Sequence, residues 1–197
     1  MNNNKRSVLK KNVILNGAHN VFARKGFLSA TMQDVINECG ISRGGIYLYF
    51  NSIDDVFFET VTQRSVRQFD DIRETIKQNP PFEQILNNYL LEQKTRLLNH
   101  MHDDHSLLRA MYEYSFTHNH SRDRGLKQKQ INTTRATVRS LFDLGVKQNK
   151  IVDKDIKIIA DNFMLLIEGM NVLALTGELT EKQIDDQFNL FVKMSCK

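Results

Sequence analysis

Cysteine and proline are both scarce in this chain of 197 residues. The two cysteines, Cys39 and Cys196, lie far apart, which excludes a disulfide-stapled scaffold and favours a reducing, cytoplasmic setting. The two prolines, Pro80 and Pro81, are adjacent, so the strongest helix breaker occurs at one point only. The rest of the chain is therefore free to form long helices.

Acidic residues are absent before Asp34. Residues 1–50 hold seven lysines and arginines against two acidic residues, whereas residues 51–197 hold 20 basic and 21 acidic residues. A basic first quarter on a nearly neutral body favours an anionic partner, most often nucleic acid. A solvated basic terminus is the alternative interpretation.

Long hydrophobic runs are also missing. The longest apolar run, residues 163–175, is interrupted by Glu168, Gly169 and Asn171, whereas a membrane span needs about 18 apolar residues. We expect this run to form a helix that is buried on most of its faces. The first eleven residues are polar and basic with no apolar core behind them, so we expect no secretion signal and no membrane partner.

Apolar residues recur at steps of three and four along nearly the whole chain, and strict alternation is missing. The pattern predicts an all-α protein of about nine helices. A hydrophobic content of 41% and a charged content of 25% are those of an ordinary globular protein. We expect two domains: a basic three-helix unit over residues 1–50 and a larger helical body over residues 51–197.

Start and stop signals place several helix ends. Gly40 and Gly177 stand where a glycine ends a helix. Three pairs have the spacing of a capping box at a helix start: Thr31 with Asp34, Ser52 with Asp55, and Thr180 with Gln183.

The most informative stretch is residues 31–50, TMQDVINECGISRGGIYLYF. Thr31 caps a first helix of about nine residues, Gly40 can take a positive φ in a tight turn, and Ser42 caps a second short helix that runs to about Tyr49. Two short helices joined by such a turn are typical of a helix-turn-helix. In this motif the second helix enters the major groove of DNA with its N-terminal residues at the base edges.

The side chains of this stretch have the chemistry that DNA contacts require. Arg43 can form two hydrogen bonds to guanine, worth about 1–3 kcal/mol of discrimination, and a glycine permits close approach of the backbone. Hydroxyl groups and helix N-termini can bind phosphate oxygens. The predicted DNA-binding residues are Thr31, Gln33, Ser42, Arg43, Gly44, Gly45, Tyr47 and Tyr49.

Residues 8–60 resemble the DNA-binding domain of the TetR family of bacterial transcriptional regulators. The resemblance rests on Gly26-Phe27, Thr31, Val35-Ile36, Gly40-Ile41-Ser42, Gly44 and Tyr47-Leu48-Tyr49-Phe50. It implies DNA contacts by Thr31, Ser42, Arg43, Tyr47 and Tyr49. Two positions depart from the family pattern: Tyr49 replaces a frequent histidine, and Ile53 replaces a usual phosphate-binding lysine. Lys25 or the N-terminal lysines could replace that phosphate contact.

The larger body would hold the dimer interface and an effector site. A two-fold operator needs a dimer, and the expected helices at about 154–176 and 180–195 carry wide apolar faces; in the resembled family these two helices form a four-helix bundle. The predicted interface residues are Phe163, Ile167, Met170, Leu173, Ala174, Ile184, Phe188 and Phe191. Aromatic residues at helical spacing are more often core than ligand site, and Tyr112, Phe116 and Phe163 are the candidate effector contacts.

Residues 100–105, HMHDDH, concentrate side chains that can bind metal or transfer protons. His102-Asp103 resembles the dyad of HD-domain phosphohydrolases, which makes a metal-dependent phosphohydrolase the alternative function. His19 and Asp161 could complete such a site, although no local pattern supports either residue. A solvated connection between helices is the simpler interpretation, and a regulatory metal or pH-sensing role is a third.

The sequence therefore predicts a cytoplasmic, homodimeric DNA-binding transcriptional regulator that is not an enzyme and needs no cofactor or metal. Its partners would be operator DNA and a small-molecule effector that releases it from a palindromic operator, so that it acts as a repressor. Besides the phosphohydrolase, a helical scaffold that binds another protein is the remaining alternative.

Overall fold

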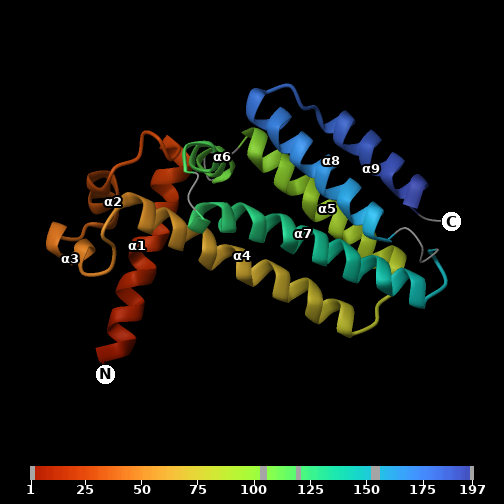
Figure 1. The fold of residues 1–197 in the computed structure, drawn as a ribbon, viewed down its shortest axis with the longest axis horizontal. Helices are drawn as coiled ribbons and strands as arrows, with labels where there is room; N and C mark the ends of the chain where they lie inside the picture. Colours follow the sequence, from red (N-terminus) through yellow and green to blue (C-terminus); the bar gives the residue numbers. More distant parts are fainter. Residues whose placement is uncertain (1–2, 103–105, 119–120, 152–155, 196–197) are drawn as a thin grey trace. The chain divides into compact units, whose positions relative to one another are not determined.

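The computed structural model describes residues 3–102, 106–118, 121–151 and 156–195. Within these ranges the chain forms nine α-helices and no β-strand, which confirms the predicted all-α class (Figure 1). The helices are α1 (Asn3–Lys25), α2 (Met32–Cys39), α3 (Arg43–Tyr47), α4 (Ile53–Lys77), α5 (Phe82–His102), α6 (Leu108–Thr117), α7 (Ser121–Lys147), α8 (Ile156–Thr176) and α9 (Glu181–Ser195).

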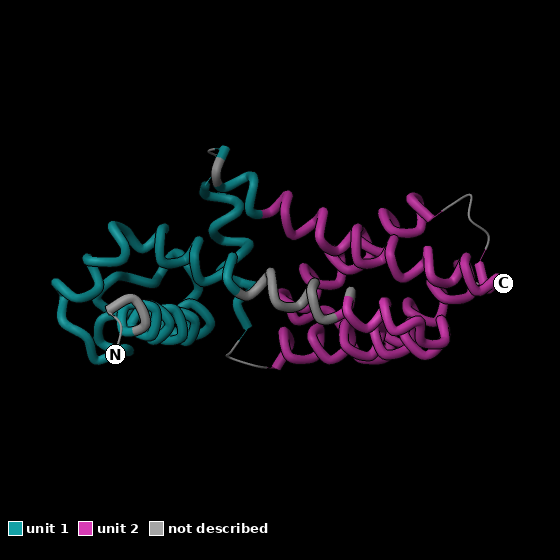
Figure 2. Tube along the Cα trace, turned by 90° about the horizontal axis from the view of Figure 1, so that it is seen from below, with its two compact units in different colours: residues 1–65, 104–126 teal, residues 66–103, 127–197 magenta. Residues whose placement is uncertain are grey.

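The chain divides into two compact units (Figure 2). Unit 1 comprises residues 1–65 and 104–126, and unit 2 comprises residues 66–103 and 127–197. Helices α4 and α7 each contribute residues to both units. Helix α6 thus belongs to the same compact unit as the first three helices. The predicted boundary at residue 50, between a DNA-binding domain and a helical body, stays a prediction.

The predicted caps form where the spacing places them. Thr31 Oγ1 accepts a hydrogen bond from the Asp34 N–H at 3.2 Å, and Asp34 Oδ2 accepts one from the Thr31 N–H at 3.0 Å. Thr180 and Gln183 form the same reciprocal pair, with distances of 3.2 and 2.8 Å. Gly177 has a φ of 77° and ends α8.

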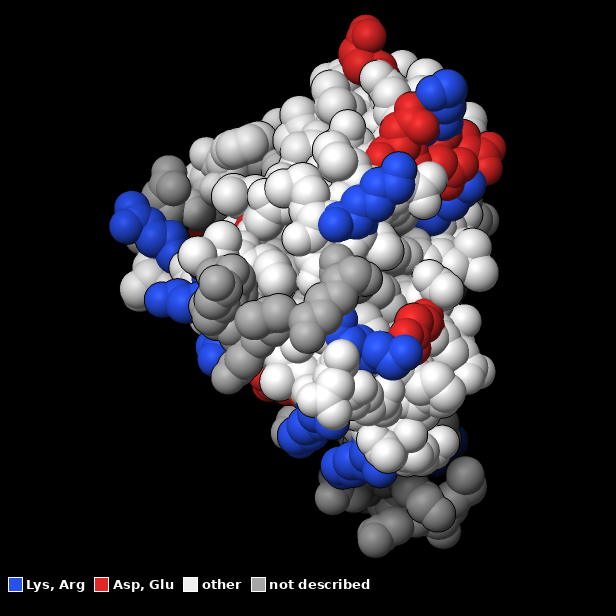
Figure 3. Space-filling view, turned by 90° about the vertical axis from the view of Figure 1, so that its right-hand side faces the viewer, with Lys and Arg blue, Asp and Glu red and all other residues white. Residues whose placement is uncertain are grey.

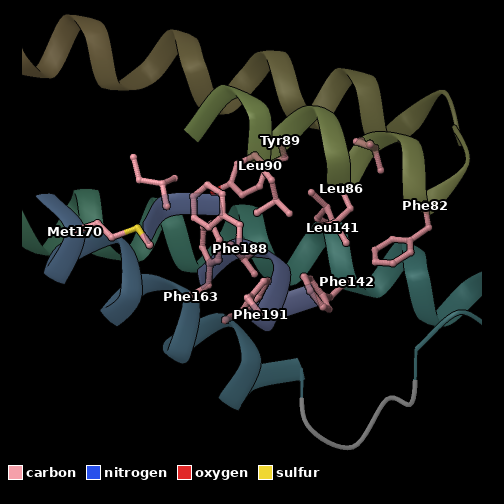
Figure 4. Close-up of a cluster of buried hydrophobic side chains, with 14 of the residues drawn as sticks. Phe82, Leu86, Tyr89, Leu90, Leu141, Phe142, Phe163, Met170, Phe188 and Phe191 are labelled. Carbon is pink, nitrogen blue, oxygen red and sulfur yellow. The ribbon is translucent and has the colours of Figure 1, made fainter. Parts of the chain in front are cut away.

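Each unit has its own hydrophobic core. The core of unit 2 is formed mainly by α5, α7, α8 and α9 around phenylalanine side chains, with the rings of Phe163 and Phe191 4.9 Å apart and those of Phe82 and Phe142 5.8 Å apart (Figure 4). The core of unit 1 joins α1, α2, α3 and α6 to the beginning of α4.

Helix α8 is less buried in the single chain than the sequence suggests. It is the one described helix that is long and apolar enough to cross a membrane by length and composition, yet only 28% of its apolar window is buried. Ile158 and Leu165 are 68% and 65% exposed. Only one side of α8 packs against the core of unit 2. The expectation that this helix is buried on most of its faces is therefore wrong.

The same packing shows how far the predicted interface residues are exposed in the single chain, while the interface itself stays a prediction. Six of the eight are buried in the core of their own chain: Phe163, Met170, Ala174, Ile184, Phe188 and Phe191. Leu173 is 41% exposed, and Ile167 is half-buried against the core.

Candidate nucleic-acid interface

The helix-turn-helix is held by the core of unit 1. Val35 and Ile36 of α2 and Ile46 of α3 are buried in it, next to a cluster of aromatic rings that includes Phe22 and Phe57 at 4.9 Å. Gly40 ends α2 with a φ of 62°, a left-handed conformation that favours glycine. The two short helices are therefore oriented by burial, and their other side remains exposed.

Helix α3 is shorter than predicted, since it ends at Tyr47 and residues 48–49 form a turn. Its start is the one expected: Ser42 Oγ accepts a hydrogen bond from the Gly45 N–H at 3.2 Å. A helix of five residues gains little from its own backbone hydrogen bonds, so its position depends on this cap and on buried Ile46.

The predicted base-reading residues lie together on the exposed side of α3. Ser42, Arg43 and Gly44 are exposed, and Tyr47 is 41% exposed. The Arg43 guanidinium lies over the Tyr47 ring, 5.9 Å from its centre, an arrangement that favours a cation–π contact. The start of α3 thus presents a cation, a phenol and a hydroxyl to the solvent within two turns of helix.

Gly44 is not required by the packing of the protein. A Cβ at Gly44 would meet no atom within 4 Å, and its φ is not positive. At Gly45, by contrast, a Cβ would lie 3.1 Å from Ser42 Oγ. Glycine at position 44 is therefore explained better by something outside the chain that approaches the backbone closely.

Besides the capping residues Thr31 and Ser42, three more of the predicted contacts have internal partners. Lys25 Nζ pairs with Asp34 Oδ1 at 2.6 Å, and this hydrogen bond, followed by the one from Thr31, lowers the pKa of Asp34. Gln33 donates to Asn37 Oδ1 at 2.8 Å. Tyr49 is half-buried against the core of unit 1. Lys25, Gln33 and Tyr49 would have to give up part of these contacts to reach DNA.

Glu113 of α6 is a residue that the sequence did not single out. Its Oε2 accepts hydrogen bonds from the Phe27 N–H at 2.6 Å and the Leu28 N–H at 3.0 Å, in the turn before α2. Its Oε1 accepts one from Arg109 Nε at 2.7 Å. Gly26 has a φ of 76°, and a Cβ there would lie 2.5 Å from the Glu113 carboxylate, so glycine is needed for this contact.

The environment keeps Glu113 ionised. Burial acts to raise the pKa of its carboxyl, but hydrogen bonds from Leu28, Arg109 and Phe27 outweigh burial and lower the pKa. Close by, Tyr114 and His118 stack at 4.2 Å, and Tyr114 packs edge-on against Phe27 at 4.9 Å. Helix α6 therefore supports the helix-turn-helix through one carboxylate and a group of aromatic rings. The contacts of Glu113 and Tyr114 with Phe27 and Leu28 join residues more than 80 positions apart, so no local pattern in the sequence indicates them.

The candidate effector residues are not brought together within one unit. Tyr112 and Phe116 lie in unit 1 with ring centres 5.9 Å apart, and Phe116 is 75% exposed. Phe163 is completely buried in the core of unit 2.

The histidine cluster gives the phosphohydrolase alternative no support. Asp103 and His105 lie outside the described residues, and His102 is exposed. Asp161 is paired with Arg135 in unit 2, while His19 is buried in unit 1. Among the residues that the structure describes, no group of three histidine, cysteine or acidic side chains could hold a metal ion.

The N-terminal region is similar to a known protein family and to curated proteins. Residues 14–60 match the model of bacterial regulatory proteins of the tetR family. Two curated relatives come from Bacillus subtilis and are described as uncharacterized HTH-type transcriptional regulators. YfiR is 48% identical over 60 residues, which cover 29% of this chain and 29% of YfiR. YerO is 35% identical over 77 residues, which cover 38% of this chain and 27% of YerO. The matches thus span less than a third of these relatives' own lengths.

Solved structures share the fold along nearly the whole chain. A putative TetR-family transcriptional regulator from Mesorhizobium loti has a TM-score of 0.74 at 19% identity, covering 98% of this chain and 99% of its own. Reduced NemR of E. coli has a TM-score of 0.77 at 12% identity, with 94% and 97% covered. A putative regulator from Saccharomonospora viridis, solved with choline, has a TM-score of 0.75 at 19% identity, with 95% and 97% covered.

Proposed function

We propose that this chain, whose residues 14–60 match the tetR family of bacterial regulatory proteins, is a cytoplasmic transcriptional repressor of that family that binds operator DNA as a homodimer and is released by a small-molecule effector. The helix-turn-helix of unit 1 would enter the major groove with the start of α3 first. Arg43 would read guanine, and Ser42 and Tyr47 would bind phosphates.

The observation that carries the DNA-binding proposal is the exposed start of α3. Arg43, Gly44 and Tyr47 share this surface, and Gly44 has no role in the packing of the chain. Charge also supports the assignment, since the first 50 residues are basic and the rest of the chain is nearly neutral. Figure 3 shows a face on which Lys and Arg groups lie beside Asp and Glu groups, and such mixed charge is less favourable for DNA.

A homodimer would form through the exposed apolar stripe of α8. Ile158, Leu165 and Val172 follow one another at seven-residue steps and are 68%, 65% and 47% exposed. This is the spacing of a seam between two packed helices. A Cβ at Gly169, on the same stripe, would meet no atom within 4 Å, which leaves room for a partner helix. On α9, Leu190 and Met194 would extend the surface.

Effector release would be a population shift. An effector bound to unit 2 would favour a state in which the two helix-turn-helix units of the dimer no longer match the half-sites. Helices α4 and α7 each have residues in both units, so a movement of either helix in unit 2 would be transmitted to unit 1. In support, the S. viridis neighbour was solved with choline, so a chain of this fold can hold a small molecule.

The proposal is tested by titrating the purified protein against the DNA that flanks its own gene at several salt concentrations. We expect saturable binding to one segment and an affinity that falls steeply with salt. Arg43→Ala should remove about 1–3 kcal/mol of preference for the specific segment. Arg139→Ala, at an exposed position of unit 2, makes the same change in charge and should keep the preference. Weak binding that is equal on all sequences would contradict the regulator function.

A further inference from the structure

Leu48 is an apolar side chain that the fold leaves in the solvent at the end of α3. It is 82% exposed, the largest exposed fraction of any large apolar side chain that the structure describes. Ile46, two residues earlier, is completely buried in the core of unit 1. Two residues that are two positions apart on a helix lie about 200° apart around it, so the burial of Ile46 directs Leu48 away from the core. The packing of unit 1 therefore explains the orientation of Leu48 but does not bury its side chain.

Leu48 shares its side of the helix with the predicted base-reading residues. Its backbone is still right-handed, with a φ of −70° and a ψ of −20°, so the helical rotation of about 100° per residue continues to this position. An arc of about 140° of the helix circumference, on the side away from Ile46, then holds four residues: Arg43, Gly44, Tyr47 and Leu48. The surface that is proposed to enter the major groove thus ends in an apolar group.

Gly44 leaves Leu48 uncovered on this surface. The two residues are four positions apart, so they are neighbours on one face of the helix. Side chains on a helix lean toward its N-terminus, which brings the Leu48 side chain toward position 44. Glycine has no side chain there, and even a Cβ would meet no atom within 4 Å. A group that enters beside Gly44 can therefore contact the methyl groups of Leu48.

The chemistry of leucine limits what this contact can be. Its side chain has neither a donor nor an acceptor, so it cannot bind a phosphate or read a polar base edge. The apolar group that DNA displays in the major groove is the C5 methyl of thymine. The helix from Ser42 to Leu48 rises about 9 Å, and the groove is about 12 Å wide, so both ends of the helix can reach base edges.

We propose that Leu48 packs against the C5 methyl group of a thymine in each operator half-site and so selects thymine at one base position. The inference rests on the proposed function, to which it adds a specificity-determining residue that needs no hydrogen bond. Arg43 would read guanine at the start of α3, and Leu48 would read thymine at its end.

The test removes the methyl group from the DNA. The segment that the protein binds in the titration above is synthesised with each thymine in turn replaced by deoxyuridine, which lacks only the C5 methyl. For the wild-type protein we expect one position in each half-site where the replacement weakens binding by about fourfold, which corresponds to about 0.8 kcal/mol. Leu48→Met keeps a long apolar side chain and should keep this loss. Leu48→Ala should reduce the loss to less than about 1.5-fold, because the methyl group then has no partner.

Three further measurements separate this contact from a loss of structure or of charge. Leu91→Ala makes the same truncation at a 63% exposed position of unit 2 and should keep the fourfold loss. Leu48→Ala should leave the salt dependence of binding unchanged, whereas a lost phosphate contact would lower the slope of log K against log salt by about 0.9. The melting temperature of Leu48→Ala should stay within about two degrees of wild type, since the side chain is exposed.

The outcomes distinguish the thymine contact from the regulator function. If deoxyuridine costs nothing at any position, or costs as much in Leu48→Ala as in wild type, the thymine contact is overturned and the regulator function is unaffected. If the wild-type protein binds no DNA segment specifically, both are overturned.

Discussion

At the scale of single residues, Gly44 is a glycine that the fold does not require but that DNA binding would explain. Its backbone is not left-handed, and a side chain there would touch nothing in the chain. Glycine costs up to about 1 kcal/mol relative to alanine in a helix. A residue that weakens a five-residue helix without serving the packing is best explained by a close contact with the operator backbone.

Gly44→Ala should therefore keep or raise the stability of the protein while it weakens operator binding. We expect the free energy of unfolding to rise by up to about 1 kcal/mol. Operator affinity should fall about tenfold, which corresponds to 1.4 kcal/mol. Chemical denaturation and a DNA titration measure the two effects. Gly125→Ala, at an exposed helical glycine with equally open surroundings, is the control that should leave DNA affinity unchanged.

Glu113 acts at the same scale by holding the turn before α2. Glu113→Ala should destabilise unit 1 by about 1–3 kcal/mol, since it leaves the partly buried Phe27 and Leu28 N–H groups without their acceptor. Glu113→Gln keeps an acceptor and should lose less. Urea denaturation measures the free energy of unfolding, and equal values for wild type and Glu113→Ala would show that Glu113 does not stabilise this turn.

The Glu113 contribution should also depend on pH. Its folded pKa is lowered below the ordinary 4.5, so the stabilisation is complete above the unfolded pKa and disappears as the pH falls through the folded pKa. The stability difference between wild type and Glu113→Gln should therefore narrow in acid, which urea unfolding at pH 7 and at pH 3 can compare.

At the scale of elements, α8 carries two apolar stripes, and only one of them lies in the core. Phe163, Met170 and Ala174 face the inside, whereas Ile158 and Leu165 remain exposed. Both stripes have helical periodicity, so the sequence cannot distinguish the stripe that packs in the chain from the one that is left for a partner. The interface predicted from sequence therefore includes side chains that are buried within the single chain, and the exposed stripe is the surface we propose for a partner.

Leu165→Glu should convert the proposed dimer to monomers, because it puts a charge in the middle of the exposed stripe. Analytical ultracentrifugation measures the change, and circular dichroism should show unchanged helix content. Leu91→Glu makes the same substitution at a 63% exposed position of α5 and should remain dimeric. A dimer that persists in Leu165→Glu would place the interface elsewhere.

At the scale of the whole molecule, binding of DNA and of effector should be linked. If an effector lowers operator affinity by a given factor, the operator must lower effector affinity by the same factor. Two calorimetric titrations of the effector, with and without saturating operator, test the equality. Equal effector affinity in both would exclude the population shift.

Helix α6 shows why the molecule cannot be divided along the sequence. Residues 1–65 alone would lack the Glu113 carboxylate and the Tyr114 ring that packs on Phe27 and Phe57. The expected domain of residues 1–50 contains all of the helix-turn-helix but only part of the core that supports it.

The sequence by itself determined the helical class, the ends of several helices and the helix-turn-helix with its exposed Arg43 and Tyr47. These features depend on interactions within about four residues, such as the Thr31–Asp34 cap and the apolar spacing of α2, and such interactions leave local patterns. Only the tertiary structure decided which stripe of α8 is buried, that α6 belongs to unit 1, and that Glu113 holds the turn at Phe27. Those outcomes depend on contacts between residues far apart in the chain, whose partners are chosen by packing and have no local signature.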